Sequence, residues 1–415
     1  MSNPPGSGFY RRGGRTSLAI DNLRAYVVLL VVAFHSSLAY LAFLPAHPFA
    51  FDQPPFQWRA FPIVGSDRSV VLELFCAWQD IFLMSLFFFL SGLFVWPSLK
   101  RKDGPRFVAD RLRRLGLPFL LVVALLMPIA HYPTYLQTAV APGIGEYIRA
   151  FLALPIWPCG PMWFLWLLLC ADLLAAGLGS IVPDWGERLA RLSSTAGARP
   201  ARYFLWLLAA SAVAYVPAAL IFTPQAWAQW GPFPLQLSRP LHYTLYFFAG
   251  AGLGAYGIER GLLGPEGALV KYWRVWLGLA LGSFALWLGV TAMVVESHGP
   301  VGMGLRIIDD LSFVVACLCN SFGVLALALR FTVRRRGWLD NLKENAYGIF
   351  LVHYVFVIWL QYALLPADLP GMVKAAFVFA GTVLLSWGTT AGTRHLRAFI
   401  ASSMTGGRDA AARLS

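Results

Sequence analysis

The sequence has 415 residues, a length that would allow two or three soluble domains. Residues of the AVILMFWYC set make up 58% of it and charged residues only 13%, whereas a soluble domain has about 25% charged residues. This composition excludes a disordered chain, a collagen-like chain and a disulfide scaffold, and it indicates an integral membrane protein with many spans.

Ten apolar segments have the length of about 17–25 residues that a membrane-spanning helix requires. Backbone groups in lipid must form their hydrogen bonds internally, so each segment is predicted to be a helix of an all-α polytopic bundle. The third segment is short, and Pro118 and Pro128 leave its limits open. The ten predicted helices lie near 25–44, 72–97, 115–131, 161–182, 203–223, 240–258, 273–295, 308–329, 346–365 and 372–392.

Positive charge alternates between the connecting segments. Most of the 33 Lys and Arg residues lie before residue 25, in the stretches 100–114, 188–202, 260–274 and 330–343, and in the tail from 394. Cytoplasmic loops carry such an excess, so the N- and C-termini are both predicted to be cytoplasmic. The net charge of +13 is therefore expected at the cytoplasmic membrane surface, near lipid, and not on a nucleic-acid-binding face.

The predicted organisation has three parts: an N-terminal cytoplasmic segment at 1–22, a membrane-embedded domain at 23–392 and a cytoplasmic tail at 393–415. The polar stretch at about 183–202 is predicted to be a loop, and no soluble domain is expected. The first helix is too long for a cleaved signal peptide. Cys76 and Cys159 both fall near the outer face, and a disulfide between them is left open. No Cys/His spacing resembles a zinc site, so no metal is expected.

Two ionisable residues share one face of the first helix. Arg24 and His35 are eleven residues apart, which is about 20° beyond three full turns and about 16 Å along the axis. This spacing puts a guanidinium at the inner surface and an imidazole near the middle of the membrane, where ionisable groups usually serve a function. A snorkelling arginine and a hydrogen-bonded core histidine are the alternative.

The second helix offers a carboxylate and an aromatic run. Asp80 lies at a depth similar to that of His35 and is a candidate to orient it, as is Asp172 on the fourth helix; either could pair with an arginine or a hydroxyl instead. The helix ends in Phe87-Phe88-Phe89-Leu90-Ser91-Gly92, which could line an apolar slot or only pack another helix. Ser-Gly allows close backbone approach, and Gly250-x3-Gly254 likewise predicts helix packing.

A basic cluster precedes the third helix. Arg111 and Arg114 stand at its cytoplasmic entry, followed by Leu115 and Pro118. Arginine binds phosphate through two parallel hydrogen bonds, so these residues suit a phosphate-rich ligand. Anionic lipid is the alternative partner.

Together these residues resemble the acyltransferase-3 family. Asp21-Asn22-Leu23-Arg24 with His35 is similar to its Arg-x10-His motif, and the phenylalanine run with Ser91-Gly92 is similar to its FFxxSG element. Arg111-x2-Arg114 resembles its RxxR segment, and 162–165 and 346–353 resemble later family features. The likeness runs in order over about 20–390. Asn22 in place of a glycine resembles the branch that includes the glucan succinyltransferase.

The resemblance implies a stand-alone O-acyltransferase of the bacterial inner membrane. It would move an acetyl or succinyl group from acyl-CoA to a glycan or glycoside outside. His35 would be the general base, with an acyl-histidine less favoured, and Asp80 would orient it. The implied donor-binding residues are Arg24, Phe88, Ser91, Arg111 and Arg114. His353 is expected to be a structural or channel residue, and His242, Tyr243 and Tyr246 are interface anchors or acceptor contacts.

A transporter or flippase for a sugar, lipid or anion is the competing hypothesis. Ten helices and a basic cavity would suit it. Many transporters have inverted halves with broken helices at matching positions, and the sequence shows neither. A transporter also gives no special role to Arg24 and His35 on one helix face.

Overall fold

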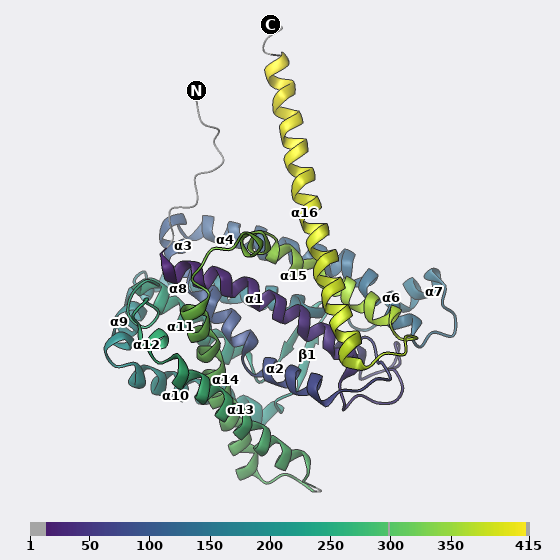
Figure 1. Ribbon diagram of the computed structural model, residues 1–415, viewed down its shortest axis with the longest axis horizontal. Coiled ribbons are helices and arrows are strands. Elements are labelled where there is room, and N and C mark those ends of the chain that lie inside the picture. The colour runs from purple at the N-terminus through teal and green to yellow at the C-terminus, as the bar shows by residue number, and fades with distance from the viewer. Residues whose placement is uncertain (1–13, 298, 412–415) are drawn as a thin grey trace. The chain divides into compact units, whose positions relative to one another are not determined.

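The chain is mostly helical, with loops between the helices (Figure 1). The computed structural model describes residues 14–297 and 299–411, with side chains described as far as Leu396. The helices are α1 Arg15–Ser37, α2 Val70–Gly92, α3 Val95–Lys102, α4 Gly104–Arg111, α5 Leu117–Leu121, α6 Met127–Leu136, α7 Ile144–Ala153, α8 Trp163–Ile181, α9 Trp185–Ala198, α10 Pro200–Phe222, α11 Pro240–Tyr256, α12 Ala268–Lys271, α13 Trp273–Val295, α14 Met303–Phe331, α15 Gly337–Ala363 and α16 Gly371–Ala411.

The predicted spans correspond closely to these helices. Within 14–297 and 299–411, nine helical segments are long and apolar enough to cross a membrane. The tenth predicted span, 240–258, is α11, whose 17 residues stand at the lower length limit for a span. The all-α, polytopic prediction is therefore confirmed.

The third span is longer than predicted. It covers Gly104–Leu136 and includes two π-helical turns, Leu112–Gly116 and Val122–Leu126. Proline has no N–H and its ring clashes with the carbonyl four residues earlier, at Arg114 for Pro118 and at Ala124 for Pro128. Both of those carbonyls lie inside the π turns, so the helix widens locally and continues past each proline.

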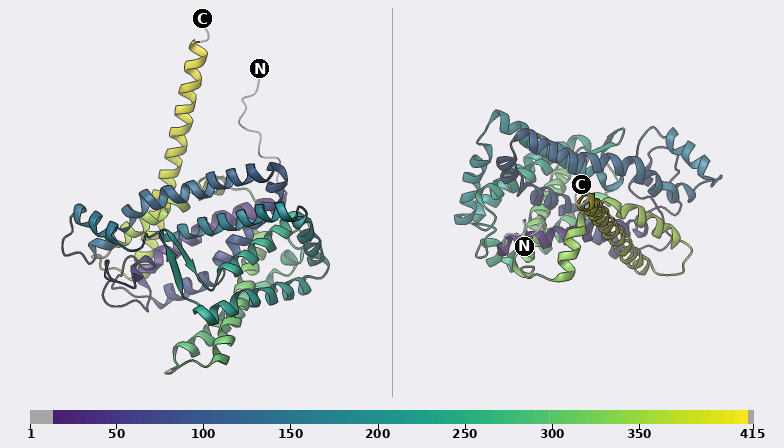
Figure 2. Two further views of the ribbon diagram at one scale, coloured as in Figure 1. Left: turned by 180° about the vertical axis from the view of Figure 1, so that it is seen from behind. Right: turned by 90° about the horizontal axis from the view of Figure 1, so that it is seen from above.

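Several elements between the spans were not predicted, among them a helix and a hairpin. The stretch 183–202, expected to be a loop, contains the 14-residue helix α9, which buries Trp185 and Ala196 and packs against α11. Its apolar residues are few and its polar face is broad, so it lacks the signature of a span. Strands β1 Trp227–Trp230 and β2 Phe233–Gln236 form an antiparallel hairpin after α10, drawn as two arrows in Figure 2. Five cysteines lie in the described residues, and no disulfide joins them.

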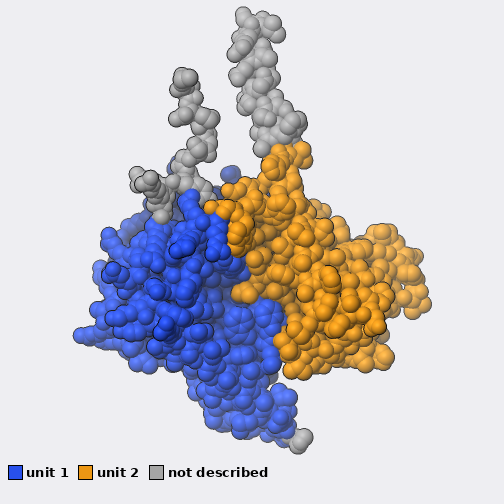
Figure 3. Space-filling model, in the orientation of Figure 1, with its two compact units in different colours: residues 1–27, 74–123, 155–336 blue, residues 28–73, 124–154, 337–415 orange. Residues whose placement is uncertain are grey.

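The chain forms two compact units, coloured separately in Figure 3. The first comprises 1–27, 74–123 and 155–336, and the second comprises 28–73, 124–154 and 337–415. In the first unit α13 packs along α14, and in the second α15 packs along α16. Helix α1 contributes its first half to one unit and its last half, with His35, to the other.

Glycines bring α2 and α11 into backbone contact in the first unit. A Cβ built on Gly92 would overlap the carbonyl oxygen of Phe247, and one built on Gly250 would overlap that of Phe89. Gly254 meets the Leu93 carbonyl oxygen in the same way. The helix packing predicted for Ser91-Gly92 and for Gly250-x3-Gly254 is therefore present, and the two sequences pack against each other.

Candidate functional site

His35 lies in the last turn of α1, in the second unit, and as a residue it is intermediate between buried and exposed. Its Nδ1 is 2.8 Å from the backbone oxygen of Val31, one turn earlier. A carbonyl oxygen only accepts hydrogen bonds, so Nδ1 carries the proton and donates it. In the neutral imidazole this arrangement leaves a lone pair on Nε2, the form that a general base requires.

Helix α15 supplies two further contacts to His35. Nε2 of His353, a fully buried residue, lies 3.4 Å from Nδ1 of His35. Eight residues along the same helix, Gln361 donates hydrogen bonds to the backbone oxygens of His35 at 2.8 Å and Ser36 at 3.3 Å. These oxygens lie at the end of α1, where carbonyl groups lack helical partners. One helix therefore contacts both the ring and the backbone of His35.

Aromatic rings and a third histidine surround this pair. The ring of Tyr354 meets that of His35 edge-on at 5.3 Å between centroids, and it lies 5.9 Å from the ring of His131. His131 is fully buried beside Trp58, at 5.1 Å. Neither His131 nor Tyr354 was predicted to lie beside His35, because the residues come from α6 and α15 and no spacing along the chain links them to α1.

The predicted arginines gather in the first unit, but they differ in environment. Arg24 is exposed, with its guanidinium 5.5 Å from the Phe94 ring, and its charge interacts with that of Arg111. Arg111 forms an ion pair of 3.2 Å with buried Asp172 on α8. The arginine alternative considered for Asp172 is therefore the one observed. The charge of Arg24 also interacts with that of Asp21, so each of these two arginines has an acidic residue near it.

Arg114 is the second arginine of the RxxR segment. Its side chain is 67% exposed and forms an ion pair of 2.9 Å with Asp110. A pair with so exposed a guanidinium contributes little to stability, and Asp110 also accepts a hydrogen bond of 2.8 Å from Lys102. Asn22, two residues before Arg24, donates a hydrogen bond of 2.6 Å to the Thr332 oxygen and so ties α1 to the end of α14.

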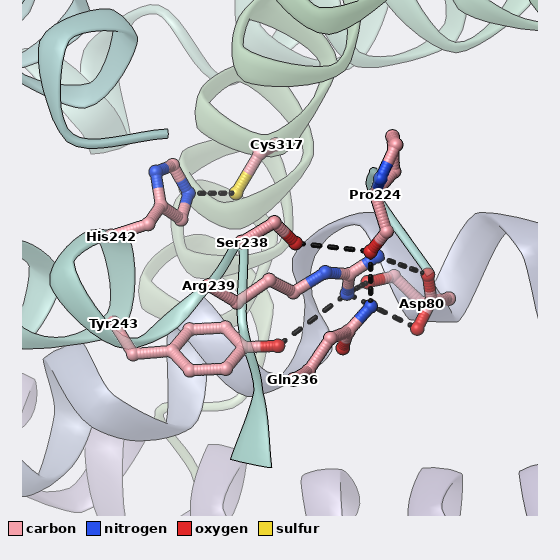
Figure 4. Close-up of polar contacts among 8 residues, drawn as sticks. All are labelled: Asp80, Pro224, Gln236, Ser238, Arg239, His242, Tyr243 and Cys317. Atoms are coloured by element: carbon pink, nitrogen blue, oxygen red, sulfur yellow. Dashed lines mark hydrogen bonds and ion pairs between the residues drawn. The ribbon is translucent and has the colours of Figure 1, made fainter. Parts of the chain in front are cut away.

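Asp80 pairs with Arg239, the residue before α11 (Figure 4). Nη2 of Arg239 donates to Oδ2 at 2.6 Å, and Nη1 donates to Oδ1 at 3.2 Å and to the Asp80 backbone oxygen at 2.9 Å. The Tyr243 hydroxyl lies 3.4 Å from Nη1, on the other side of the guanidinium. Asp80 thus adopts the arginine alternative, and the carboxylate has a structural partner in its own unit.

Phe88 and Ser91 were predicted to line the donor channel. Phe88 is buried, stacked on Tyr243 at 5.1 Å and edge-on to Phe164 at 5.2 Å, an arrangement that fits helix packing. Ser91 is only partly buried. The side chains of His242, Tyr243 and Tyr246, candidate acceptor contacts, are buried as well. Figure 4 shows the His242 ring directed at Cys317, with Nε2 3.3 Å from Sγ.

Comparison with known proteins gives the class of the chain. Residues 17–391 match the family described as an acyltransferase domain, which spans every helix from α1 to most of α16. Neither the curated proteins nor the solved structures include a match. The match covers most of the sequence and contains His35 and all three arginines of the motifs. The chain is therefore a membrane acyltransferase that belongs to the acyltransferase-3 family.

Proposed function

We propose that this membrane acyltransferase moves a short acyl group, acetyl or succinyl, from cytoplasmic acyl-CoA to a hydroxyl of an extracytoplasmic glycan or glycoside. The observation on which the proposal rests is the tautomer of His35. Its Nδ1–H is bound to the Val31 oxygen, so Nε2 has the lone pair. Such a histidine can take a proton from an approaching hydroxyl.

In the proposed reaction, Nε2 of His35 removes the proton of the acceptor hydroxyl as its oxygen attacks the thioester carbonyl. The tetrahedral adduct then collapses, the carbon–sulfur bond breaks, and the new ester forms. The CoA thiolate takes the proton back from Nε2, so the histidine leaves the cycle neutral. Direct transfer needs no covalent enzyme intermediate, and it is preferred here to an acyl-histidine.

The arginines support the donor assignment. Arg24 and Arg114 are exposed, and the charge of Arg111 lies close to that of Arg24. Coenzyme A is rich in phosphate, and guanidinium groups bind phosphate well. Because α1 is one uninterrupted helix, Arg24 and His35 keep the shared face that their spacing predicts. The arm of the donor would follow this face from the cytoplasmic surface toward His35, and the bacterial inner membrane would be the setting.

The test uses purified protein in detergent with radiolabelled acetyl-CoA and succinyl-CoA. Thioester cleavage and label transfer to membrane glycan are measured for wild type, His35→Ala and the control His47→Ala, whose side chain is exposed in a loop. We expect turnover in wild type and His47→Ala, and its loss in His35→Ala with CoA binding retained. Full turnover in His35→Ala would remove the histidine from the mechanism, and absence of acyl-CoA binding to wild type would remove the donor.

A further inference from the structure

We propose that His353 is a positioning residue for His35: it accepts the Nδ1–H of His35 and stabilises the positive charge that His35 acquires as a base. This inference rests on the proposed function. His353 was expected to be a structural or channel residue, and the sequence did not predict its contact with His35.

The tautomer of His353 follows from its own backbone contact. Nδ1 of His353 lies 2.7 Å from the Phe350 oxygen, three residues earlier. A carbonyl oxygen cannot donate, so Nδ1 is protonated and Nε2 of the neutral ring has the lone pair. That nitrogen is the one located 3.4 Å from Nδ1 of His35. Both imidazoles therefore have complementary forms: His35 offers a proton, and His353 offers an acceptor.

The Nδ1–H of His35 is shared between two acceptors. The Val31 oxygen at 2.8 Å is the main one, and His353 at 3.4 Å is the longer one. When Nε2 of His35 takes up a proton, Nδ1–H becomes a stronger donor, and its hydrogen bond to the lone pair of His353 becomes stronger. The proton count is unchanged: one proton enters from the hydroxyl, and one leaves to the thiolate, whether Nδ1–H stays on His35 or moves to His353.

A neutral partner suits this position. His353 is fully buried, and a carboxylate there would place an unpaired charge in the membrane whenever His35 is neutral. An imidazole is uncharged in the resting state and still accepts a hydrogen bond. Its ring is fixed by the Phe350 oxygen and lies beside the rings of Phe350 at 5.8 Å and Tyr354 at 6.2 Å. Gln361 of the same helix fixes the backbone of His35.

The kinetic test compares His353→Leu, which removes the acceptor, with His353→Gln, whose amide oxygen can restore it. Both are assayed by acetyl-CoA cleavage in detergent. We expect Leu to lower kcat about 10–100-fold, the range seen when the hydrogen-bond partners of metal-binding histidines are removed, with KM for acetyl-CoA unchanged. Gln should recover most of kcat. A purely structural role would predict loss of folded protein or a raised KM, with no recovery by Gln.

Nitrogen NMR of the full chain labelled with 15N-histidine supplies a second measurement on wild type. The difference between wild type and His353→Gln assigns the ring, and we expect a protonated Nδ1 and an unprotonated Nε2. A protonated Nε2 in His353 overturns the inference, as does wild-type kcat in a folded His353→Leu variant. If His35→Ala itself retains kcat, the proposed function fails; if His35→Ala is inactive while His353→Leu is not, only this inference fails.

Discussion

The Asp80–Arg239 pair is strongly asymmetric, and this asymmetry predicts an unequal response to mutation. The Arg239 side chain is 6% exposed and that of Asp80 is 53% exposed. Removing the carboxylate leaves a buried guanidinium without a counterion, whereas removing the guanidinium leaves a carboxylate that the protein does not enclose. The two single substitutions therefore break the same ion pair at different cost.

Asp80→Ala is expected to lower the free energy of unfolding by about 3–5 kcal/mol, the usual cost of an uncompensated buried charge. Arg239→Met should cost about 1–2 kcal/mol, from a partly exposed ion pair and the lost contact of the guanidinium with the Phe313 ring at 4.9 Å. The double variant has no buried unpaired charge, so it should be more stable than Asp80→Ala alone.

Unfolding of the three variants in mixed detergent–SDS micelles measures these differences, and acetyl-CoA cleavage at a permissive temperature is the second readout. Additive costs, or a larger loss for Arg239→Met than for Asp80→Ala, would refute the asymmetry. The activity separates two roles for Asp80. If the carboxylate only pairs with Arg239, the double variant recovers activity with stability; if Asp80 orients His35, the double variant stays inactive.

Three more outcomes follow from single features. In Gly250→Ala the new methyl group should overlap the Phe89 carbonyl and lower the free energy of unfolding by about 1–3 kcal/mol or more. The control Gly278→Ala, in open space on α13, should not lower it. Equal effects of the two variants in a thermal unfolding assay would contradict the close packing. Arg114→Ala should raise KM for acyl-CoA and leave stability unchanged, whereas Arg111→Ala should also lower stability, because Asp172 stays buried without its partner. A loss of stability with Arg114→Ala would contradict this difference. The hydrogen bond from buried Lys374 lowers the pKa of Asp67 in the loop before α2, so the stabilisation from this carboxylate is complete above its unfolded pKa of about 3.9 and is lost as the pH falls through the lower folded pKa. Asp67→Asn should therefore remove the loss of stability at acidic pH that this carboxylate causes, when the free energy of unfolding is measured against pH. An unchanged pH profile would contradict a stabilising role for this hydrogen bond.

The spans and one helix contact could be predicted from sequence because both depend on local rules. Long apolar stretches must be helical in lipid. Gly92, Gly250 and Gly254 have no side chain, so they allow close backbone approach whichever helix lies against them. Residue pairings could not be predicted, since they depend on which helices become neighbours. Asp80 and Arg239 are 159 residues apart, and His35 and His353 are 318 apart. Helix α9 was missed because its stabilisation comes from packing on α11 and not from an apolar composition.

The first π turn also determines the rotational phase of the RxxR segment. In an α-helix, residues three apart lie about 60° from each other around the axis. A π turn needs one more residue to close, so over Leu112–Gly116 the same spacing covers a smaller angle and the two side chains diverge. Arg111 turns to Asp172, and Arg114 turns to solvent. Deletion of Leu115 or Gly116 would keep the spacing of the arginines, restore the α-helical register and bring both guanidinium groups toward one side. The length of this segment therefore controls the arrangement of the arginines as much as their identity does.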